Sequence, residues 1–450
     1  MFHRLLIANR GEVAVRIARA CRELSIAPIG VCSEADRGAS WLEAMDEVVC
    51  LGPGPAKSSY LDAERVVQAA VQTRASALHP GWGFLAENAR FAALCEQHGV
   101  TFVGPTARAM TLMGLKTPAK RAMRAAGLSV IPGSDGPLAS VDAAVACARE
   151  IGYPVIVKAD AGGGGRGMRT CRDEADLRAA WDAASREAQG AFGNGDIYLE
   201  RYLERGRHIE VQVLCDQHGR AVHLYERECS IQRRHQKLIE ESPSPVLSAA
   251  ERDALGARAA TAAASIGYRG AGTMEFFRSP DGAIHFMEMN TRLQVEHPVT
   301  EMVTGVDIAA WQIRIAARER LALEQRAVQL TGHAIEARVN AEDPTQGFRP
   351  TPGKVTHFEI PTDRGPGRVR VDTHVRAGDS IPPLYDSLVA KVIAHGATRD
   401  EAIATLERAL GAARIEGIAT TIPLHLSVLA SAEFRAGRYD TSSIPGWPSS

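Results

Sequence analysis

Lysine is scarce in this chain of 450 residues, since only seven of its 52 basic residues are lysine. Other features are missing altogether. The net charge of −1 gives no basis for binding nucleic acid or a basic membrane surface. No apolar run approaches the roughly 18 residues that span a bilayer, and the amino terminus becomes polar too soon for a signal peptide. These absences favour a globular protein with no nucleic-acid and no membrane partner.

The eight cysteines are scattered and include no C-x-x-C pair. This spacing favours free thiols in a reducing compartment over disulfides or zinc, so the expected location is the cytoplasm. In a chain this rich in arginine, a retained lysine is expected where a compact ammonium group is needed. Lys116, Lys158 and Lys237 stand in suggestive surroundings, although chance survival explains any one of them equally simply.

The length predicts two to four domains. Over the first 105 residues, apolar strands expected at 4–8, 29–32, 75–78 and 100–103 alternate with helices. This alternation predicts a doubly wound parallel sheet, so the fold class is α/β, within a mixed α+β multidomain chain. Breaker clusters and pattern changes divide the chain into four parts, listed here in order: 1–113, a helical connector 114–131, a small unit 132–203, and a long unit 204–446.

Five polar residues occupy every second position in the segment F-M-E-M-N-T-R-L-Q-V-E-H-P: Glu288, Asn290, Arg292, Gln294 and Glu296. On an extended strand all five would line one face. An acid beside an amide suits a hard cation such as Mg²⁺. Arginine beside a carboxylate suits binding a small planar anion and removing its proton. A site is therefore expected here, with an ordinary edge strand as the alternative.

A glycine run at 162–165 follows a predicted strand that ends in Lys158. Residues 168–171 resemble another strand, so the glycines would form a hairpin rather than open a dinucleotide-binding helix. Bare backbone N–H groups in such a hairpin can close over phosphates. A plain flexible hairpin is the alternative reading.

Four further segments carry residues that could belong to a site. The predicted strand 198–203 could offer backbone groups to a nucleotide base. His208 alternates with acids and amides along the next predicted strand, although a lone histidine is more often structural. Residues 226–237 form a dense polar stretch that is expected to belong to the site, with a solvated charged loop as the alternative. Glu275 lies among apolar neighbours, where a carboxylate needs a partner or a metal, and it would complete a metal site with Glu288 and Asn290.

Seven segments together resemble the biotin carboxylases, the ATP-grasp subunits of biotin-dependent carboxylases, and most of all the subunit of bacterial acetyl-CoA carboxylase. They are I-A-N-R-G-E (7–12), H-P-G-W-G-F-L-A-E-N (79–88), G-G-G-G-R-G-M (162–168), S-I-Q-R-R-H-Q-K (230–237), G-Y-R-G-A-G-T (267–273), E-M-N-T-R-L-Q-V-E-H-P-V-T-E (288–301) and Y-D-S (385–387). The resemblance implies a Rossmann-like amino-terminal domain, an ATP-grasp lid, a carboxy-terminal catalytic domain and, usually, a homodimer.

The resemblance also implies which residues hold each group. ATP would contact Lys116, Lys158, Gly163, Gly164, Gly165, Glu200, Leu203, His208, Gln232 and His235. Mg²⁺, or sometimes Mn²⁺, would be held by Glu275, Glu288 and Asn290. Bicarbonate would contact Lys237, Arg292, Gln294, Val295 and Glu296. Biotin would contact Trp82 and Arg338, and Trp82 replaces a tyrosine that is usual in the family.

The implied chemistry begins when Glu296 removes the proton of bicarbonate, which then attacks ATP to form carboxyphosphate. That intermediate would yield CO₂ and phosphate, and the phosphate would take the ureido proton of biotin. Arg338 would stabilise the resulting enolate-like oxygen. Because carboxyphosphate hydrolyses readily, a lid that excludes water would serve this reaction.

The chain contains no Met-Lys dipeptide of the kind that carries biotin. Biotin is therefore expected to arrive on a separate biotin carboxyl carrier protein, with carboxyltransferase subunits completing the assembly. The final acceptor stays open between acetyl-CoA and another acyl-CoA. Two other functions also stay open: a different ATP-grasp ligase that activates another carboxylate, and a non-catalytic nucleotide-binding subunit.

Overall fold

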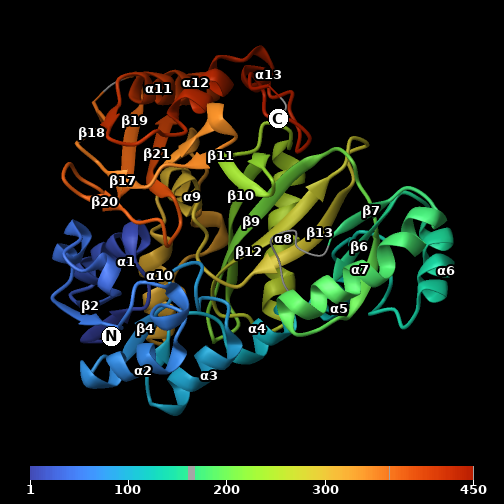
Figure 1. The fold of residues 1–450 in the computed structure, drawn as a ribbon, viewed down its shortest axis with the longest axis horizontal. Coiled ribbons are helices and arrows are strands. Elements are labelled where there is room, and N and C mark those ends of the chain that lie inside the picture. The colour runs from blue at the N-terminus through green and yellow to red at the C-terminus, as the bar shows by residue number, and fades with distance from the viewer. Residues whose placement is uncertain (161–167, 364, 449–450) are drawn as a thin grey trace.

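The computed structural model describes residues 1–160, 168–363 and 365–448. Within these residues the strands form one five-stranded, one three-stranded and one eight-stranded sheet, and three short two-stranded pairs. Figure 1 shows the five-stranded sheet and the carboxy-terminal helices on one side of the large sheet, with the three-stranded unit projecting on the other. The mixed α/β multidomain fold is confirmed.

The amino-terminal sheet is parallel throughout, in the order β3-β2-β1-β4-β5. Its strands are β1 (Arg4–Ile7), β2 (Ala27–Cys32), β3 (Glu47–Cys50), β4 (Ala77–His79) and β5 (Thr101–Phe102). Alternate residues of β1 enter different cores: Leu5 packs with α1 (Gly11–Glu23), and Leu6 packs with α2 (Ala63–Gln72) and α3 (Ala89–Gln97). Helices therefore cover both faces, which confirms the doubly wound arrangement.

Two helices, α4 (Ala107–Gly114) and α5 (Lys116–Ala125), lead into the small antiparallel sheet β7-β6-β8. The strands are β6 (Val155–Ala159), β7 (Arg169–Cys171) and β8 (Ile197–Arg201), and the helices packed on them are α6 (Val141–Ile151) and α7 (Glu174–Phe192). Asp173 caps α7 by accepting from the N–H of Asp176 at 2.9 Å. The two strands expected around the glycine run are thus present.

The large sheet is antiparallel, in the order β13-β12-β9-β10-β11-β14-β21-β19. Its strands are β9 (Arg207–Cys215), β10 (Ala221–Arg233), β11 (Gln236–Ser242), β12 (Gly270–Arg278), β13 (Ile284–Asn290), β14 (His333–Asn340), β19 (Arg368–Thr373) and β21 (Leu388–Gly396). Every residue of β9 is buried. Polar side chains on this strand therefore need partners inside the protein.

Helices and short strand pairs complete the carboxy-terminal half. The helices are α8 (Ala249–Ser265), α9 (His297–Thr304), α10 (Ile308–Ala316), α11 (Arg399–Gly411), α12 (Ile422–Ala430) and α13 (Ala432–Arg435). The short pairs are β15 (Glu342–Asp343) with β16 (Arg349–Pro350), β17 (Gly353–Lys354) with β20 (Ser380–Ile381), and β18 (His357–Glu359) with β22 (Arg414–Glu416). Across the described ranges, no helix has the length and apolar character that crossing a bilayer requires.

The expectation of one strand from Glu288 to Glu296 is wrong in its second half, because β13 ends at Asn290. The N–H of Thr291 donates to Glu87 Oε1 at 2.9 Å instead of pairing within the sheet. Glu296 then occupies the N-cap position of α9, and Pro298 lies in the first turn of that helix, where its missing N–H costs nothing. The polar residues are therefore brought together by a strand end, a loop and a helix start.

Candidate active site

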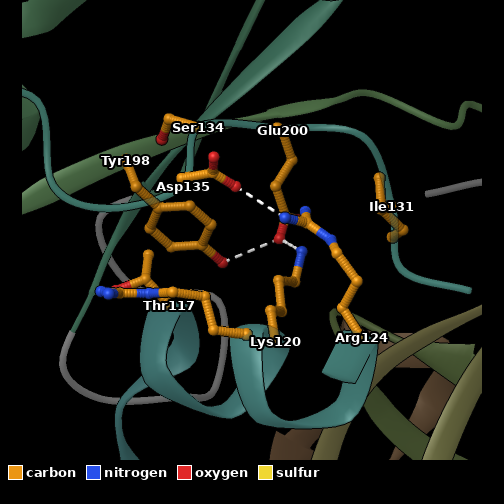
Figure 2. Close-up of a pocket in the computed structure, with 10 residues that line it drawn as sticks. Thr117, Lys120, Arg124, Ile131, Ser134, Asp135, Tyr198 and Glu200 are labelled. Carbon is orange, nitrogen blue, oxygen red and sulfur yellow. Dashed lines mark hydrogen bonds and ion pairs between the residues drawn. The ribbon is translucent and has the colours of Figure 1, made fainter. Parts of the chain in front are cut away.

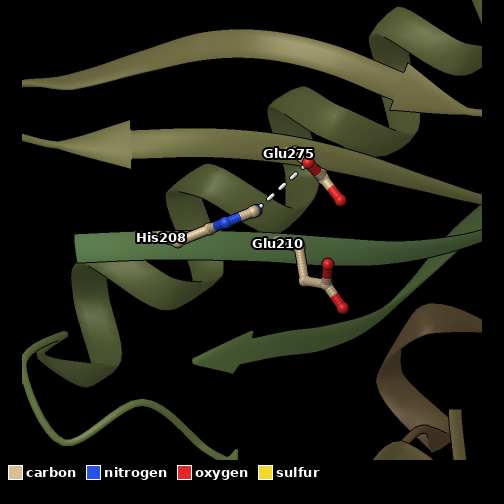
Figure 3. Close-up of side chains that lie close together, drawn as sticks. All are labelled: His208, Glu210 and Glu275. Carbon is tan, nitrogen blue, oxygen red and sulfur yellow. Dashed lines mark ion pairs between the residues drawn. The ribbon is translucent and has the colours of Figure 1, made fainter. Parts of the chain in front are cut away.

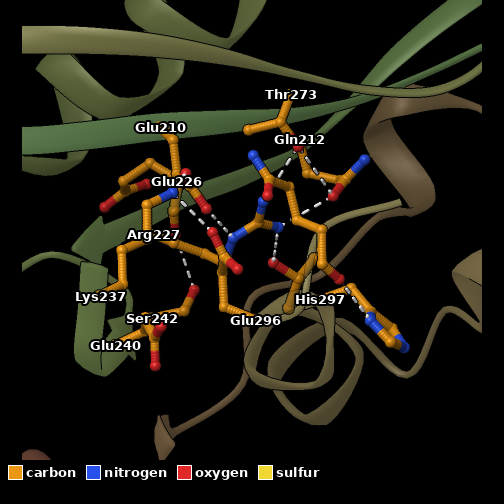
Figure 4. A network of polar contacts seen from close by, with 12 residues as sticks. Glu210, Gln212, Glu226, Arg227, Lys237, Glu240, Ser242, Thr273, Glu296 and His297 are labelled. Atoms are coloured by element: carbon orange, nitrogen blue, oxygen red, sulfur yellow. Dashed lines mark hydrogen bonds and ion pairs between the residues drawn. The ribbon is translucent and has the colours of Figure 1, made fainter. Parts of the chain in front are cut away.

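Glu296 lies at the centre of a buried cluster of charges between three elements. Lys237 Nζ, from β11, donates to Glu296 Oε1 at 2.6 Å. Arg338 Nη2, from β14, donates to Glu296 Oε2 at 2.8 Å. Figure 4 shows Lys237 and Glu296 pointing toward one another across the end of the sheet. One carboxylate thus joins the lysine predicted for bicarbonate and the arginine predicted for biotin.

The charges of this cluster hold Glu296 in its ionised form. Its side chain is fully buried, and burial alone would raise its pKa. Lys237, Arg338 and Arg227 more than offset that effect, so the pKa of Glu296 lies well below its ordinary value. The pKa of Lys237 is raised in spite of burial because Glu210, Glu275 and Glu296 surround it. A deprotonated carboxylate beside a fixed ammonium group can accept a proton from a bound anion.

Arg292 is oriented by a ring of polar contacts. Its Nε donates to Glu87 Oε2 at 2.7 Å, and its Nη1 donates to Gln294 Oε1 at 2.8 Å. Its Nη2 donates to Asn290 Oδ1 at 3.0 Å. Asn290 in turn donates to Glu275 Oε1 at 2.8 Å. The structure therefore brings Asn290, Arg292 and Gln294 together as the sequence predicts, although they are not on one strand.

Glu275 and Glu288 stand directly opposite each other on β12 and β13. Figure 3 shows that His208 and Glu210 also approach Glu275, with His208 Nε2 at 3.2 Å from Glu275 Oε2. The potential ligand atoms of His208, Glu210 and Glu275 lie within 4.8 Å of one another. Carboxylate oxygens dominate the group, and carboxylates suit Mg²⁺. The residues present thus fit a divalent cation, with Glu275 common to the predicted set and to the His208–Glu210 group.

The two lysines predicted for phosphates each meet an acid. Lys116 Nζ donates to Glu288 Oε2 at 2.5 Å, and Lys158 Nζ donates to Glu200 Oε2 at 2.5 Å. Figure 2 shows that Lys120 and Tyr198 also point at the Glu200 carboxylate, between α5 and the small sheet. The Glu200 carboxylate is therefore shared by two lysines and a tyrosine, and its backbone is paired with Ile156 of β6. Gly163, Gly164 and Gly165 lie outside the described residues.

Leu203, Gln232 and His235, which are also predicted to contact ATP, lie at or near strand ends. Leu203 follows β8 and is half-buried, and Gln232 is half-buried near the end of β10. Arg234 and His235 form the two-residue turn between β10 and β11, both with positive φ, and His235 is exposed. Two positive φ values match the turn type that tight hairpins favour, at some cost for residues other than glycine.

Trp82 and Val295 both contact the buried ion pair between Glu12 and Lys391. The indole Nε1 of Trp82 donates to Glu12 Oε1 at 3.1 Å. Lys391 is fully buried, and its Nζ lies 3.0 Å from both Glu12 Oε2 and the carbonyl of Val295. The indole N–H, which a tyrosine at this position would lack, therefore has an acceptor. The carbonyl of Val295 is held by Lys391.

Several residues that complete the site were not predicted. Arg227 is fully buried and donates to Glu210, Gln212, Thr273 and Thr300, which links three strands to α9 (Figure 4). Glu210 also pairs with Lys237, and Glu240 accepts from Arg338 Nε at 2.6 Å. The available signals were the alternation of polar residues around Glu210 and the dense polar stretch that contains Arg227. Glu87 lies inside the A-E-N segment at 86–88, and nothing in that segment predicts its contact with Arg292.

Three family models match the chain in succession. The biotin carboxylase N-terminal domain matches residues 1–110, and the ATP-binding domain of the carbamoyl-phosphate synthase L chain matches residues 116–324. The biotin carboxylase C-terminal domain matches residues 336–445. The chain belongs to the biotin carboxylase family. Its fold is that of an ATP-grasp ligase, and the resemblance of the seven segments is confirmed.

Relatives of this biotin carboxylase family member match over nearly their whole length. Biotin carboxylase 1 of Bacillus subtilis is 52% identical, over 99% of this chain and 98% of the relative. Biotin carboxylase of Pseudomonas aeruginosa is 53% identical, over 97% and 96%. The biotin carboxylase domain dimer of Hydrogenobacter thermophilus 2-oxoglutarate carboxylase, solved with MgADP, ADP and bicarbonate, aligns with a TM-score of 0.94. It is 48% identical, over 98% of this chain and 96% of that chain.

Proposed function

We propose that this protein uses ATP and bicarbonate to carboxylate biotin held on a separate carrier protein. The observation that carries the proposal is the position of Glu296 between Lys237 and Arg338, at 2.6 and 2.8 Å. A base is thereby joined to one cation suited to bicarbonate and to another suited to a biotin oxygen. An ordinary nucleotide-binding site has no need for that pairing.

In the first step, bicarbonate lies against Lys237, Arg292, Gln294 and the backbone of Val295. Glu296 takes its proton, and the freed oxygen attacks the γ-phosphorus of ATP as ADP leaves. Lys237 is held charged by its three acidic neighbours, so it stabilises the anion throughout. The product is carboxyphosphate, which separates into CO₂ and phosphate. Residues that fix the reactants in place supply most of the catalysis in phosphoryl transfer.

Lys116 and Lys158 are the proposed ligands of the ATP phosphates, together with Gly163, Gly164 and Gly165. Glu200 and the backbone of Leu203, together with His208, Gln232 and His235, would hold adenine and ribose. Glu275, Glu288 and Asn290 would hold Mg²⁺ or Mn²⁺, which when bound neutralises charge on the transferring phosphoryl group. Lys116 would exchange its contact with Glu288 for phosphate oxygens as ATP and the cation enter together.

In the second step, phosphate takes the ureido proton of biotin, and the biotin nitrogen attacks CO₂. Arg338 donates to the ureido oxygen while negative charge develops on it. Glu240 and Glu296 hold that guanidinium in place before biotin arrives. Trp82 is the proposed aromatic contact for the biotin ring, and its N–H is already used by Glu12.

The proposal includes the assembly and its setting. Biotin carboxyl carrier protein and carboxyltransferase subunits are the proposed partners, and the Hydrogenobacter dimer supports a homodimer. Acetyl-CoA is the proposed final acceptor, and another acyl-CoA or a 2-oxoacid is the alternative. The eight cysteines are all free thiols, which supports a location in the reducing cytoplasm. The division into 1–113, 114–131, 132–203 and 204–446 is kept as the proposed domain organisation.

The test is ADP release by the full chain with Mg-ATP, bicarbonate and free biotin, each omitted in turn. Turnover should require bicarbonate and rise with biotin, and Arg338→Ala should abolish the rise. Arg326→Ala, which removes an arginine whose side chain is 86% exposed, should behave like the unaltered protein. ATP hydrolysis indifferent to bicarbonate would refute the proposal in favour of another ligase. ATP binding without turnover, even with carrier protein present, would indicate a non-catalytic subunit.

A further inference from the structure

Cys32 and Cys50 stand directly opposite each other on neighbouring strands of the amino-terminal sheet. They are register partners in the parallel pair β2–β3, and the N–H of Leu51 donates to the Cys32 carbonyl at 2.7 Å. Paired residues on adjacent strands project their side chains to the same face, and the strands lie about 4.8 Å apart. That separation is within the range of Cα distances that a disulfide spans.

The two thiols lie in different environments. Cys50 is exposed, on a strand at the edge of the sheet, whereas Cys32 is 3% exposed. Burial raises the pKa of Cys32 to about 11, and the neighbouring Cys50 adds to the effect. At Cys50 burial acts in the same direction, but hydrogen bonds from Arg37 and from the Gly52 N–H outweigh it, so its pKa is lowered.

An accessible sulfur that ionises readily, next to a buried thiol, is the arrangement of a reactive cysteine with its resolving partner. Arg37 is placed for this role because it follows the short turn after Cys32 and reaches back to Cys50. Cys147 offers a contrast within the same chain. It is half-buried on α6, burial raises its pKa, and it has no cysteine among the causes that shift it.

We propose that Cys50 and Cys32 form a redox couple in which a hydroperoxide oxidises Cys50 and Cys32 then closes a disulfide between β2 and β3. The Cys50 thiolate attacks one oxygen of hydrogen peroxide, the O–O bond breaks, and a sulfenic acid and hydroxide form. The Cys32 sulfur attacks the Cys50 sulfur, and the hydroxyl group leaves with the Cys32 proton as water. Two thiols thus lose two electrons and two protons, while peroxide becomes two waters.

The couple is separate from the proposed carboxylation chemistry. It belongs to the five-stranded sheet, whereas Glu296 and Arg338 lie at the large sheet. The inference therefore stands whether or not the proposed function does. An exposed disulfide across an edge strand is also of the labile kind that cellular reductants reopen.

The test treats the full chain with hydrogen peroxide, digests it without reduction and measures the peptides by mass spectrometry. Trypsin cleaves after Arg37, so the two cysteines fall in separate peptides. We expect these peptides to be linked, two hydrogens lighter than their sum, and released by dithiothreitol. Cys147→Ser should leave the linkage unchanged, and Cys50→Ser should abolish it.

Two further variants separate the steps. With Cys32→Ser, peroxide should leave a sulfenic acid on Cys50 that dimedone traps, whereas the unaltered chain should give little adduct. Arg37→Gln should slow alkylation of Cys50 by iodoacetamide at pH 7 several-fold. The proposal is overturned if peroxide oxidises Cys147 while Cys32 and Cys50 stay reduced. It is also overturned if the dimedone adduct accumulates on Cys50 of the unaltered chain without linkage.

Discussion

Glu296 and Arg338 form a buried ion pair, with 2.8 Å between Oε2 and Nη2, although 42 positions separate them in the chain. Glu296 occupies the N-cap position of α9, and Arg338 lies on strand β14. In the proposed reaction one residue accepts the bicarbonate proton and the other stabilises the biotin oxygen. Their contact places both events at one point, so CO₂ released in the first step is already beside its acceptor.

Replacing Glu296 with glutamine should reduce bicarbonate-dependent ATP turnover by about 10²- to 10⁴-fold, the usual contribution of a general base. Glutamine keeps the shape but accepts no proton and leaves Lys237 and Arg338 less well compensated. ATP affinity, measured by titration calorimetry, should change little. Glu359→Gln, at an exposed position, is the matched control. Turnover of Glu296→Gln within a few-fold of the unaltered enzyme would show that another group is the base.

Glu87→Gln should raise the KM for bicarbonate a few-fold and leave the KM for ATP unchanged. Glu87 orients Arg292 at 2.7 Å and holds the N–H of Thr291 at 2.9 Å. The Glu87 side chain is 41% exposed, so its ion pair with Arg292 contributes about 1 kcal/mol or less. We therefore expect only a modest rise in the KM for bicarbonate. Steady-state kinetics with each substrate varied measures both constants. Glu96→Gln breaks a different ion pair at the surface, with Arg269, and should alter neither.

Lys391→Met should lower the free energy of unfolding by about 3–5 kcal/mol, the usual cost of removing one partner of a buried ion pair. Lys391 is fully buried and its loss leaves Glu12 without its cation, while the Val295 carbonyl loses a donor. Urea denaturation followed by tryptophan fluorescence measures the change. Lys57→Met, at an exposed lysine, should cost less than about 0.5 kcal/mol. Equal effects at the two positions would contradict the account.

Glu240→Gln should change how stability depends on pH. Burial raises the pKa of Glu240 to about 7, and the neighbouring Glu296 adds to the effect while Arg338 opposes it. The folded chain therefore binds more protons than the unfolded chain between pH 4.5 and 7. The stability that this proton contributes is present below about pH 4.5 and is lost as the pH rises through 7.

The unaltered chain should thus lose on the order of 3 kcal/mol relative to Glu240→Gln between pH 4.5 and 7. Denaturant titrations at several pH values measure the difference, in which effects common to both proteins cancel. Above pH 7 the difference should be constant. A difference that stays level from pH 4.5 to 7 would mean that Glu240 is ionised throughout this range.

The alternation of polar residues from Glu288 to Glu296 predicted a site correctly but not its backbone. A period of two matches a strand over Glu288–Asn290, where β13 pairs with β12. Beyond it, the same residues converge because Glu87, some 200 positions earlier, takes the Thr291 N–H. Local periodicity holds no information about such a distant partner, so the change from strand to loop was not predictable from the segment.

Register explains the residues that were missed. Arg227 is the strand partner of Glu210, and Glu240 is the partner of Glu336. These pairs exist only once the order and offset of antiparallel strands are fixed, which alternation alone leaves undetermined. Single apolar-flanked charges, such as Glu275, could be recognised as needing a partner, but the identity of that partner had to come from the fold.

The rarity of lysine has a practical consequence for labelling this protein. All seven lysines are described, and five of them hold acids in buried or half-buried ion pairs: Lys116, Lys120, Lys158, Lys237 and Lys391. Only Lys57 and Lys354 are exposed. Amine-directed reagents such as succinimidyl esters would therefore attach at two side chains and the amino terminus. A fluorophore or a surface tether could be introduced this way without engineering, on sites that lie outside the charge cluster around Glu296.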